Sequence, residues 1–268
     1  MPDQMRGRRK LTARSVIASS LLGVNPPQLT TRILVGTAEL FGIAPGTARV
    51  AMSRMVVAGE LEPTEDGYRL ASRALLARQV RQDLSKAGRV RRWRGTWRTA
   101  VVDADARSAV DRASLRGALR SLRYSELRPG VWLRPDNLKR GVLVDAEAVA
   151  DEQCRFFRAR PESATRTHDE SILLAARLWD LSGWVRTTAG LLEDLERLGT
   201  RLHEGETAAL AESFVVSADV VRHLQADPLL PAEVLPDGWS GGLLRDEHDR
   251  FDQVFRGTLR TWRDTILP

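Results

Sequence analysis

The chain has 268 residues, of which 43% are hydrophobic and 28% charged, so it is long enough for two or three compact domains and too apolar for a disordered chain. No stretch reaches the apolar length of a membrane span, and no apolar core follows the basic N-terminus as in a secretion signal. We therefore expect a cytoplasmic protein without a membrane partner. The single cysteine, Cys154, excludes an intramolecular disulfide and any multi-cysteine metal site.

The formal net charge of +6 is unevenly distributed along the chain. Residues 1–60 hold eight Lys or Arg against three Asp or Glu, and residues 78–98 hold eight against one. Residues 99–268 hold 23 basic against 28 acidic residues. A positive charge gathered in the first hundred residues is typical of contact with nucleic-acid phosphates, although a charge run alone is as often a solvated surface.

Three helices are predicted in the first sixty residues. The first runs from Leu11 to Leu22 and is ended by Gly23 and two prolines. A second helix can be capped by Thr30 or Thr31 and ends at Gly42. The third follows after a few residues, which is the spacing of a helix-turn-helix.

The third helix is predicted to bury one stripe and to leave a free face. Ala48, Met52 and Met55 recur at i, i+4 and i+7, which places them on one side. The side chains left facing outward are Thr47, Arg49, Val50, Ser53 and Arg54. Arginine can contact guanine edges in a DNA major groove, and Thr or Ser can reach bases or phosphates.

A short hairpin is predicted directly after this helix. Leu61, Tyr68 and Leu70 alternate as in two strands, and residues 64–67 supply turn-forming side chains. A helix of this kind followed by a hairpin is typical of a winged helix-turn-helix, which we place at residues 1–75. The alternative is a small helical hairpin that binds a partner and not DNA.

A basic linker helix is predicted at residues 76–92, within a helical pattern from Ser72 to Val90. Its arginines, and those just after it, are candidates for phosphate contact, while a solvated linker is an equal alternative. These candidates are Arg78, Arg81, Arg91 and Arg92.

Residues 93–165 are predicted to form a ferredoxin-like domain. The expected order is strand, helix, strand, strand, helix, strand, which is the ferredoxin-like arrangement. The predicted elements are a strand at 96–103, a helix at 107–122, strands at 125–127 and 131–133, a helix at 145–152 and a strand at 154–159.

Residues 166–268 are predicted to form a helical C-terminal domain. Three amphipathic runs precede a proline-rich loop, and a final helix from Leu244 to Trp262 follows it. The first run is expected to place Ile172, Leu173, Ala176, Leu178 and Trp179 on its apolar side. The fold class is thus α+β with several domains.

Four stretches, in order along the chain, together resemble the PaaX family of bacterial transcriptional repressors. They are ARSVIASSLLG at 13–23, GTARVAMSRMVVAGEL at 46–61, ELRPGVWLRPDN at 126–137 and DPLLPAEVLPDGWSG at 227–241. The helix and hairpin are shared by many winged-helix regulators. The two proline motifs of the last stretch, with the preceding Gly-Val-Trp, are much more specific.

The resemblance implies a winged helix, a middle domain related to the small subunit of CRISPR adaptation complexes, and a helical C-terminal domain. It implies a homodimer on a palindromic double-stranded operator DNA, released by an acyl-CoA thioester inducer such as phenylacetyl-CoA. By resemblance the DNA-binding positions are Thr47, Arg49, Val50, Ser53 and Arg54, with Arg69 on the wing. Family members often carry Trp where this chain has Glu60, a change that we expect to matter little for function.

An acyl-CoA ligand needs basic groups for its phosphates and an apolar slot for its acyl part. Candidates for the first are Arg134, Lys139 and Arg140, beside Trp132, and candidates for the second are Trp179, Trp184 and Trp239. The alternative for each of them is an ordinary core Trp or surface Arg.

A rival class is a metal-dependent nuclease. Asp103 lies at a strand end where CRISPR-type nucleases carry a metal-binding carboxylate, and two such residues in a dimer could hold one Mg²⁺. The alternative is that Asp103 and Asp105 cap the next helix or a turn. The chain has no phosphate-cradling Gly loop and no nucleophile elbow. We therefore expect no enzyme, no cofactor and no metal; a regulator without any small-molecule ligand is a further alternative.

Overall fold

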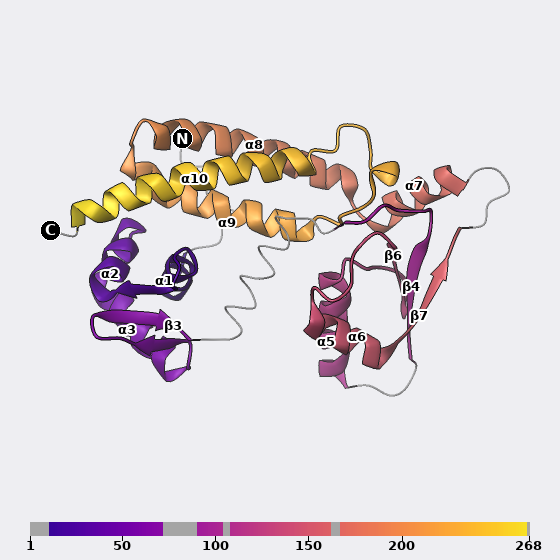
Figure 1. Cartoon of the computed structure of the whole chain (residues 1–268), viewed down its shortest axis with the longest axis horizontal. Helices are drawn as coiled ribbons and strands as arrows, with labels where there is room; N and C mark the ends of the chain where they lie inside the picture. The colour runs from indigo at the N-terminus through magenta and orange to yellow at the C-terminus, as the bar shows by residue number, and fades with distance from the viewer. Residues whose placement is uncertain (1–10, 72–89, 104–107, 162–166, 267–268) are drawn as a thin grey trace. The chain divides into compact units, whose positions relative to one another are not determined.

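The computed structural model describes residues 11–71, 90–103, 108–161 and 167–266 (Figure 1). Their contacts define two compact units, and each unit is assembled from separate stretches of the chain. The first comprises residues 1–83, 189–224 and 243–268, and the second comprises residues 84–188 and 225–242. The sequence suggested four consecutive domains, which is a different grouping from these two units. The four domain boundaries stay a prediction.

Most of the predicted basic linker helix, including Arg78 and Arg81, lies outside the described residues, as does Asp105. No described helix is long and apolar enough to cross a membrane.

The first unit begins with three helices: α1 (Ala13–Leu22), α2 (Thr31–Leu40) and α3 (Pro45–Val57). Side chains that precede two of them satisfy backbone groups at their starts. Thr12 and Ser15 form a reciprocal capping box on α1, and the hydroxyl of Thr30 accepts a hydrogen bond from the amide of Ile33 on α2. The sequence predicted all three helices.

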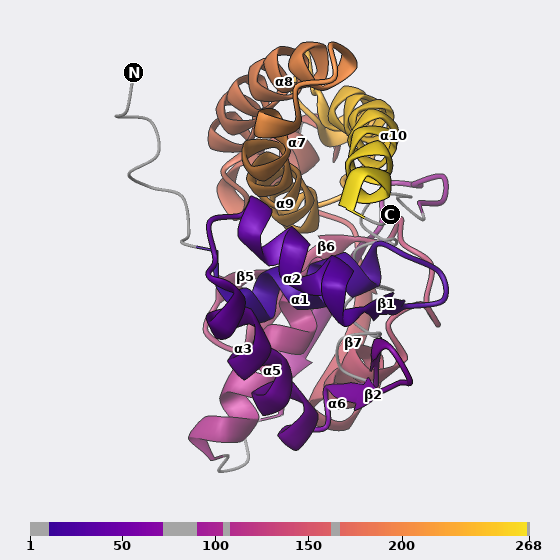
Figure 2. The same cartoon turned by 90° about the vertical axis from the view of Figure 1, so that its left-hand side faces the viewer.

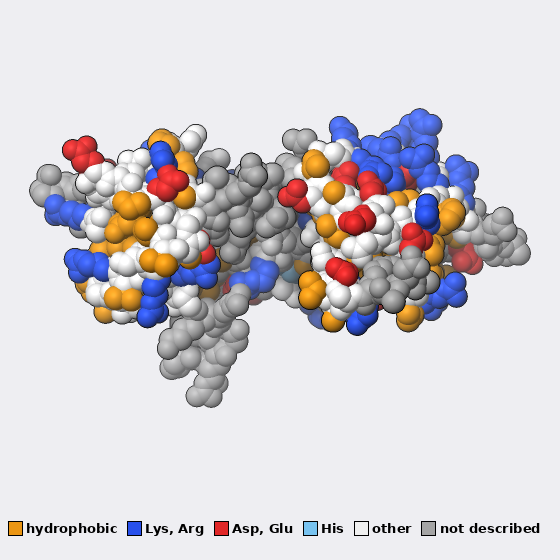
Figure 3. All heavy atoms as spheres, turned by 90° about the horizontal axis from the view of Figure 1, so that it is seen from below, with side chains coloured by type: hydrophobic (Ala, Val, Ile, Leu, Met, Phe, Trp, Pro, Cys, Tyr) orange, Lys and Arg blue, Asp and Glu red, His pale blue; other side chains and the backbone are white. Residues whose placement is uncertain are grey.

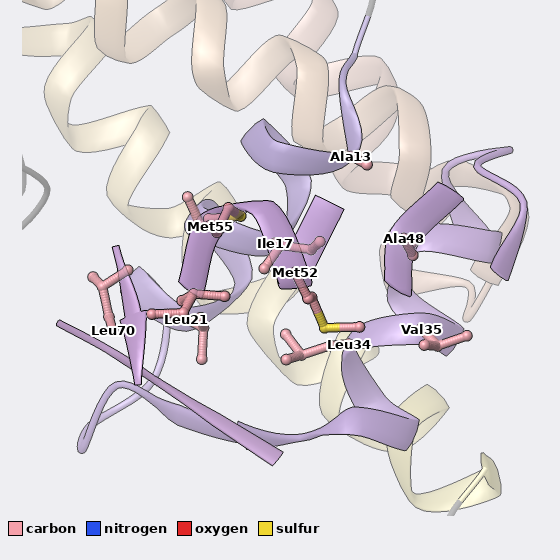
Figure 4. Close-up of a cluster of buried hydrophobic side chains, with 12 residues drawn as sticks. Ala13, Ile17, Leu21, Leu34, Val35, Ala48, Met52, Met55 and Leu70 are labelled. Atoms are coloured by element: carbon pink, nitrogen blue, oxygen red, sulfur yellow. The ribbon is translucent and has the colours of Figure 1, made fainter. Parts of the chain in front are cut away.

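The three helices bury one shared core (Figure 4). Ala48, Met52 and Met55 of α3 point into it, so the predicted apolar stripe is confirmed. Ile17 and Leu34 meet them from α1 and α2. Each Met, Ile or Leu side chain contributes about 1.5–3 kcal/mol when fully buried, so this core fixes which face of α3 remains outside.

A three-stranded antiparallel sheet adjoins these helices, in the order β1-β3-β2. The predicted hairpin is present as β2 (Leu61–Pro63) and β3 (Gly67–Leu70). The third strand, β1 (Gln28–Thr30), was not predicted. A strand of three residues directly after two prolines is too short to show an alternating pattern, so only its pairing with β3 reveals it.

Gly67 allows β1 to approach β3 closely. A Cβ atom at this position would lie 2.1 Å from the carbonyl oxygen of Leu29 and 2.6 Å from Cα of Thr30, both backbone atoms of β1. The sequence suggested only a turn residue here. The structure shows a strand position at which any side chain would displace the neighbouring strand.

Gly67→Ala should therefore destabilise the protein by about 1–3 kcal/mol, the usual cost of overpacking a tight site. Chemical denaturation of both proteins measures the difference. Gly46→Ala is the matched control, because nothing lies within 4 Å of a Cβ on this α3 glycine. It should be neutral or slightly stabilising. Equal effects of the two substitutions would contradict the role given to Gly67.

The remainder of the first unit is helical. It consists of the later part of α8 (Leu181–His203), most of α9 (Leu210–Ala226) and most of α10 (Gly241–Ile266), which Figure 2 shows nearly end-on. Leu195, Leu198 and Leu202 are buried along α8. Phe214 of α9 packs on Phe41 with ring centroids 4.8 Å apart.

The second unit contains the β-α-β-β-α-β order predicted for residues 93–165, which is confirmed. Its elements are β4 (Trp97–Val102), α5 (Ala109–Ser121), β5 (Ser125–Arg128), β6 (Val131–Pro135), α6 (Val144–Gln153) and β7 (Cys154–Ala159). The sheet is antiparallel throughout, in the order β5-β6-β4-β7.

The two faces of this sheet belong to different cores. On one face Ala100, Trp132 and Cys154 pack with Leu115 and Leu119 of α5. The other face is covered at one end by α7 (Thr167–Leu178) and by the short 3₁₀ helix η2 (Ala232–Val234). Its core contains Trp93, Trp97, Leu133, Ala175, Leu181, Leu230 and Val234.

Helix α7 buries only part of the predicted apolar side: Leu178 and Trp179 pack against the core as expected, and the other predicted positions do not. Ile172 and Leu173 are exposed, Leu173 to 67%, whereas Ser171 and Ala175 are buried. The indole Nε1 of Trp97 donates a 3.2 Å hydrogen bond to the hydroxyl of Ser171. This contact turns a polar side chain toward the sheet, which counting apolar residues along the helix could not reveal.

The loop after α9 is tied to the end of β6. The side-chain amide of Asn137 donates a 2.8 Å hydrogen bond to the carbonyl oxygen of Leu229. Leu229 has a positive φ of 52°, and its amide donates to the carboxylate of Asp227 at 2.8 Å. These two bonds hold the loop where Leu230 and Val234 enter the core.

Candidate nucleic-acid interface

The outer face of α3 is the candidate interface. The five positions expected to face outward are exposed: Thr47, Arg49, Val50, Ser53 and Arg54. The helix begins at Pro45, a residue suited to a first turn, and no side chain caps its start. Packing of the opposite stripe therefore orients this face.

The exposed face has an apolar centre and basic sides. At 100° per residue, Val50 and Val57 lie almost on one line along α3, and they are 51% and 90% exposed. Arg49 and Arg54 lie about 140° apart around the helix axis, one on each side of that line. Val57 was not among the predicted positions, although the same helical geometry places it beside Val50.

A groove runs along one side of this face, between α3 and the start of α1. It has a volume of about 470 Å³, and Thr47, Val50 and Arg54 line it from α3. Arg14 and Glu60 also line it. Three of the five predicted positions on α3 thus share one concave surface, whereas Arg49 and Ser53 do not line it.

Glu60 forms an ion pair that the sequence did not suggest. Its carboxylate accepts hydrogen bonds from both Nε and Nη2 of Arg14, the first at 2.9 Å. The Glu60 side chain is only 12% exposed. Where the family often has Trp, this chain joins the end of α3 to the start of α1 by a charge pair. No sequence pattern indicates this contact, because the partners are 46 residues apart.

The predicted arginines differ in how far their charge is compensated. Arg69 lies directly opposite Glu62 on the neighbouring strand, and the two form an ion pair with both side chains about half exposed. In the part of the chain that the structure describes, neither Arg49 nor Arg54 forms an ion pair. These two therefore offer the least compensated positive charge on the face.

The seven candidate ligand residues do not form one site. Trp132 and Arg134 are buried on the side of the sheet that α5 and α6 cover. Trp179 stacks on Trp97 on the other side, with centroids 6.4 Å apart. Trp239 stacks on Trp184 at 4.2 Å. Lys139 is exposed.

Arg140 is already paired within its own segment. It donates hydrogen bonds to the carboxylates of Glu147 and Asp151, the two acids of α6 that face it. A ligand phosphate would have to compete with both. Arg134 forms no such ion pair. Burial lowers its pKa, against the opposing effects of Tyr124 and Asp136, and burial raises the pKa of Tyr124.

Asp103 has no surrounding ligand set. Its carboxylate lies 3.4 Å from Nε of Arg155. Ser108 and Asp111 form the capping box of α5, so Asp103 does not cap that helix. Within the described ranges, no group of three or more His, Cys, Asp or Glu residues could hold a metal ion.

The three helices with their small sheet, followed by a β-α-β-β-α-β domain, define a class of protein in which a Cas2-like domain follows a helical module. Residues 12–74 match the family of PaaX-like proteins, and residues 90–172 match the PaaX protein central Cas2-like domain. The chain belongs to the PaaX family, as its four sequence stretches predicted.

A solved structure is similar over almost the whole chain. It is the uncharacterized protein Rv0674 from Mycobacterium tuberculosis, which is 40% identical, with a TM-score of 0.73. The alignment covers 93% of this chain and 98% of that one. The comparison with curated proteins gave no match.

The ion pair at the start of α1 can be tested by a double-mutant cycle. Arg14→Ala and Glu60→Ala, singly and together, should give a coupling free energy of about 1 kcal/mol in chemical denaturation, because Glu60 is shielded from water. The same cycle on Arg69 and Glu62 is the control, and it should give about 0.3 kcal/mol because both side chains are half exposed. A larger coupling for the second pair would contradict this ranking.

Proposed function

We propose that the protein is a DNA-binding transcription regulator, and specifically a dimeric repressor that an acyl-CoA inducer releases from its operator. Membership of a regulator family supports the general class. The observation that carries the DNA-binding part is the outer face of α3, where two uncompensated arginines flank an exposed valine.

In this proposal α1 to α3 and the β2–β3 hairpin act as a winged helix-turn-helix, with α3 in the major groove. Arg49 and Arg54 contact base edges or nearby phosphates, and Thr47 and Ser53 support them. Arg69 reaches the backbone from the hairpin only by leaving Glu62, so its contribution should be smaller. Val50 lies where the C5-methyl group of a thymine would be.

A dimer is proposed because two copies of α3 can then occupy two half-sites of a palindrome, about one helical turn apart. A ligand can release such a dimer only by binding a DNA-incompetent arrangement better than the competent one. The inducer's effect is therefore a difference between two dimer geometries and not a block of α3 itself.

Two alternatives make different predictions. A nuclease that uses Asp103 would cut DNA with Mg²⁺ and lose the activity on Asp103→Asn, but the Arg155 ion pair and the lack of companion ligands among the described residues weigh against it. A regulator without a ligand would show the same melting temperature with every acyl-CoA tried.

The first experiment is a DNA mobility shift on the promoter of the protein's own gene, with and without aryl- and alkyl-CoA thioesters. A specific shift that one thioester reverses supports the full proposal. A specific shift that none reverses retains the DNA-binding part and rejects the proposed inducer class. No specific shift at any promoter fragment rejects the interface on α3.

Arg49→Ala should weaken operator binding by about 1–3 kcal/mol and binding to random DNA by less, if this side chain contacts a base. Titrations of both DNAs at one salt concentration measure the two losses. Arg116→Ala, which removes an exposed arginine from α5, is the control and should leave both affinities unchanged. Equal losses on both DNAs would mean that Arg49 contacts phosphate only.

The role of Val50 can be tested from the DNA side. Replacing operator thymines one at a time by deoxyuridine removes one C5-methyl group each time. At one position in each half-site this should weaken binding roughly fourfold, which corresponds to about 0.8 kcal/mol for a buried methyl group. With Val50→Ala the same replacement should have little effect. An unchanged response in the variant would place the thymine methyl elsewhere.

A further inference from the structure

Three arginines of the Cas2-like domain lie side by side on one face of its sheet. Arg98 of β4 is in register with Arg134 of β6 and with Arg158 of β7. Because residues in register on neighbouring strands point to the same face, these side chains form a row across three strands. We call it the arginine row. Neighbouring strands lie about 4.8 Å apart, so the row spans about 10 Å.

Burial increases along the row from its edge inward. Arg158 lies on the edge strand with its side chain 63% exposed, whereas Arg134 is only 5% exposed. The guanidinium carbon of Arg134 lies 5.0 Å from the ring centroid of Tyr124, and that of Arg98 lies 5.1 Å from the ring of Phe156. Figure 3 shows Lys and Arg side chains gathered at one margin of the unit that holds this sheet, at the right of the view.

Among the described residues, one carboxylate lies at this end of the sheet, and it pairs with one member of the row and with one arginine outside it. The Asp136 side chain is 9% exposed and pairs with Nε of Arg158 at 3.0 Å and with Arg91. In the described parts of the chain, neither Arg98 nor Arg134 forms an ion pair. The buried Nε of Arg134 has no hydrogen-bond partner. Its guanidinium contacts the Tyr124 side chain and, through Nη1, the carbonyl oxygen of Pro135 at 3.4 Å, and the charge of Asp136 acts on it without a direct ion pair.

This arrangement is unfavourable by itself. Burying a guanidinium without an acid costs free energy, and like charges directly opposite on neighbouring strands repel each other. The rings of Tyr124 and Phe156 offset only part of that cost. Uncompensated buried charge is more typical of a site that receives an opposite charge than of a structural core.

We propose that the arginine row binds the phosphate groups of a small ligand. The planar fork of a guanidinium matches two phosphate oxygens, and three forks over 10 Å can hold more than one phosphate group. A compact ligand fits better than a DNA duplex, because the least compensated member of the row is also the most buried. Of the residues singled out in the sequence only Arg134 belongs to the row; Arg98 and Arg158 were not candidates.

This inference extends the part of the proposed function that concerns the ligand. It rests on the proposed function only where it assumes that the ligand is the inducer. The same phosphate chemistry could come from a free diphosphate, a nucleotide or the nucleotide part of CoA. Binding is therefore measured without DNA, so that failure of the site and failure of the repressor are separate results.

The test is calorimetric titration of the full-length protein with inorganic pyrophosphate, ADP, dephospho-CoA and CoA, at constant ionic strength, with sulfate as the control anion. Saturable binding of one or more phosphate compounds is expected, with no saturable binding of sulfate. Tighter binding of CoA than of ADP would assign the site to the inducer. Binding of pyrophosphate or ADP alone would keep the site and separate it from the inducer.

Arg158→Gln and Arg134→Met should each weaken phosphate binding tenfold or more, since a hydrogen bond to a charged group is lost. Arg128→Gln is the matched control, because it removes one exposed positive charge at the opposite end of the same sheet. It should leave binding unchanged. Arg134→Met should also keep or raise the melting temperature of the free protein, because an apolar side chain replaces an uncompensated charge.

Three outcomes would overturn the proposal. The first is equal binding by wild type, Arg158→Gln and Arg134→Met, and the second is no saturable binding of any phosphate compound. The third is a lower melting temperature of Arg134→Met with phosphate binding intact, which would make Arg134 a structural residue. A separate titration with duplex DNA identifies the reason for the second outcome: if only DNA binds, and Arg158→Gln weakens that binding, the row contacts the nucleic-acid backbone and the small-ligand proposal fails.

Discussion

The second unit depends on a stretch of chain that returns to it. After β7 and α7 the chain continues along α8 and through α9, most of which belongs to the first unit, and residues 225–242 then come back. They bring Leu230 and Val234 against Trp93 and Trp97. Without them one end of the sheet would expose large aromatic surfaces to water. The bond from Asn137 to the carbonyl of Leu229 fixes this return.

The same bond gives a physical reason for two of the four stretches that carry the family resemblance. Asn137 ends one of them, and Asp227 and Leu229 begin the other. Their residues are needed to seat an unusual backbone, with Leu229 at a positive φ, and to close a core. Trp239, in the second stretch, stacks on Trp184. The residues of these motifs therefore have a structural role in closing the core of the second unit. Ligand binding is not needed to explain them.

Periodicity predicted the parts of the fold that local burial decides. The stripe of Ala48, Met52 and Met55 set the face of α3, and the strand and helix order of the Cas2-like domain was predicted from the sequence pattern. The pairing of strands that are far apart in the sequence could not be predicted from periodicity. Strand β1 becomes visible only beside Gly67.

The candidate sites also differ in whether local sequence patterns or long-range contacts define them. Exposure on α3 follows from helical geometry, so its five positions could be predicted one by one, whereas the partner of Glu60 could not. The arginine row needs strand register, because Arg98, Arg134 and Arg158 are far apart in sequence and meet only when β4 lies between β6 and β7. The composition shows an excess of arginine residues, but only the register of the strands shows which arginines are neighbours.

The discontinuous first unit has a consequence for how the chain folds during synthesis. The helices α1 to α3 and their hairpin make contacts that are local in sequence, so they can form as soon as they leave the ribosome. Their contacts with the C-terminal helices are of the opposite kind; Arg256 bonds to the carbonyl of Gly23 across 233 residues. That part of the unit can close only after the Cas2-like domain has been made. The order of the sequence therefore means that α1 to α3 and their hairpin can fold early through local contacts. The C-terminal helices complete the first unit later through long-range contacts.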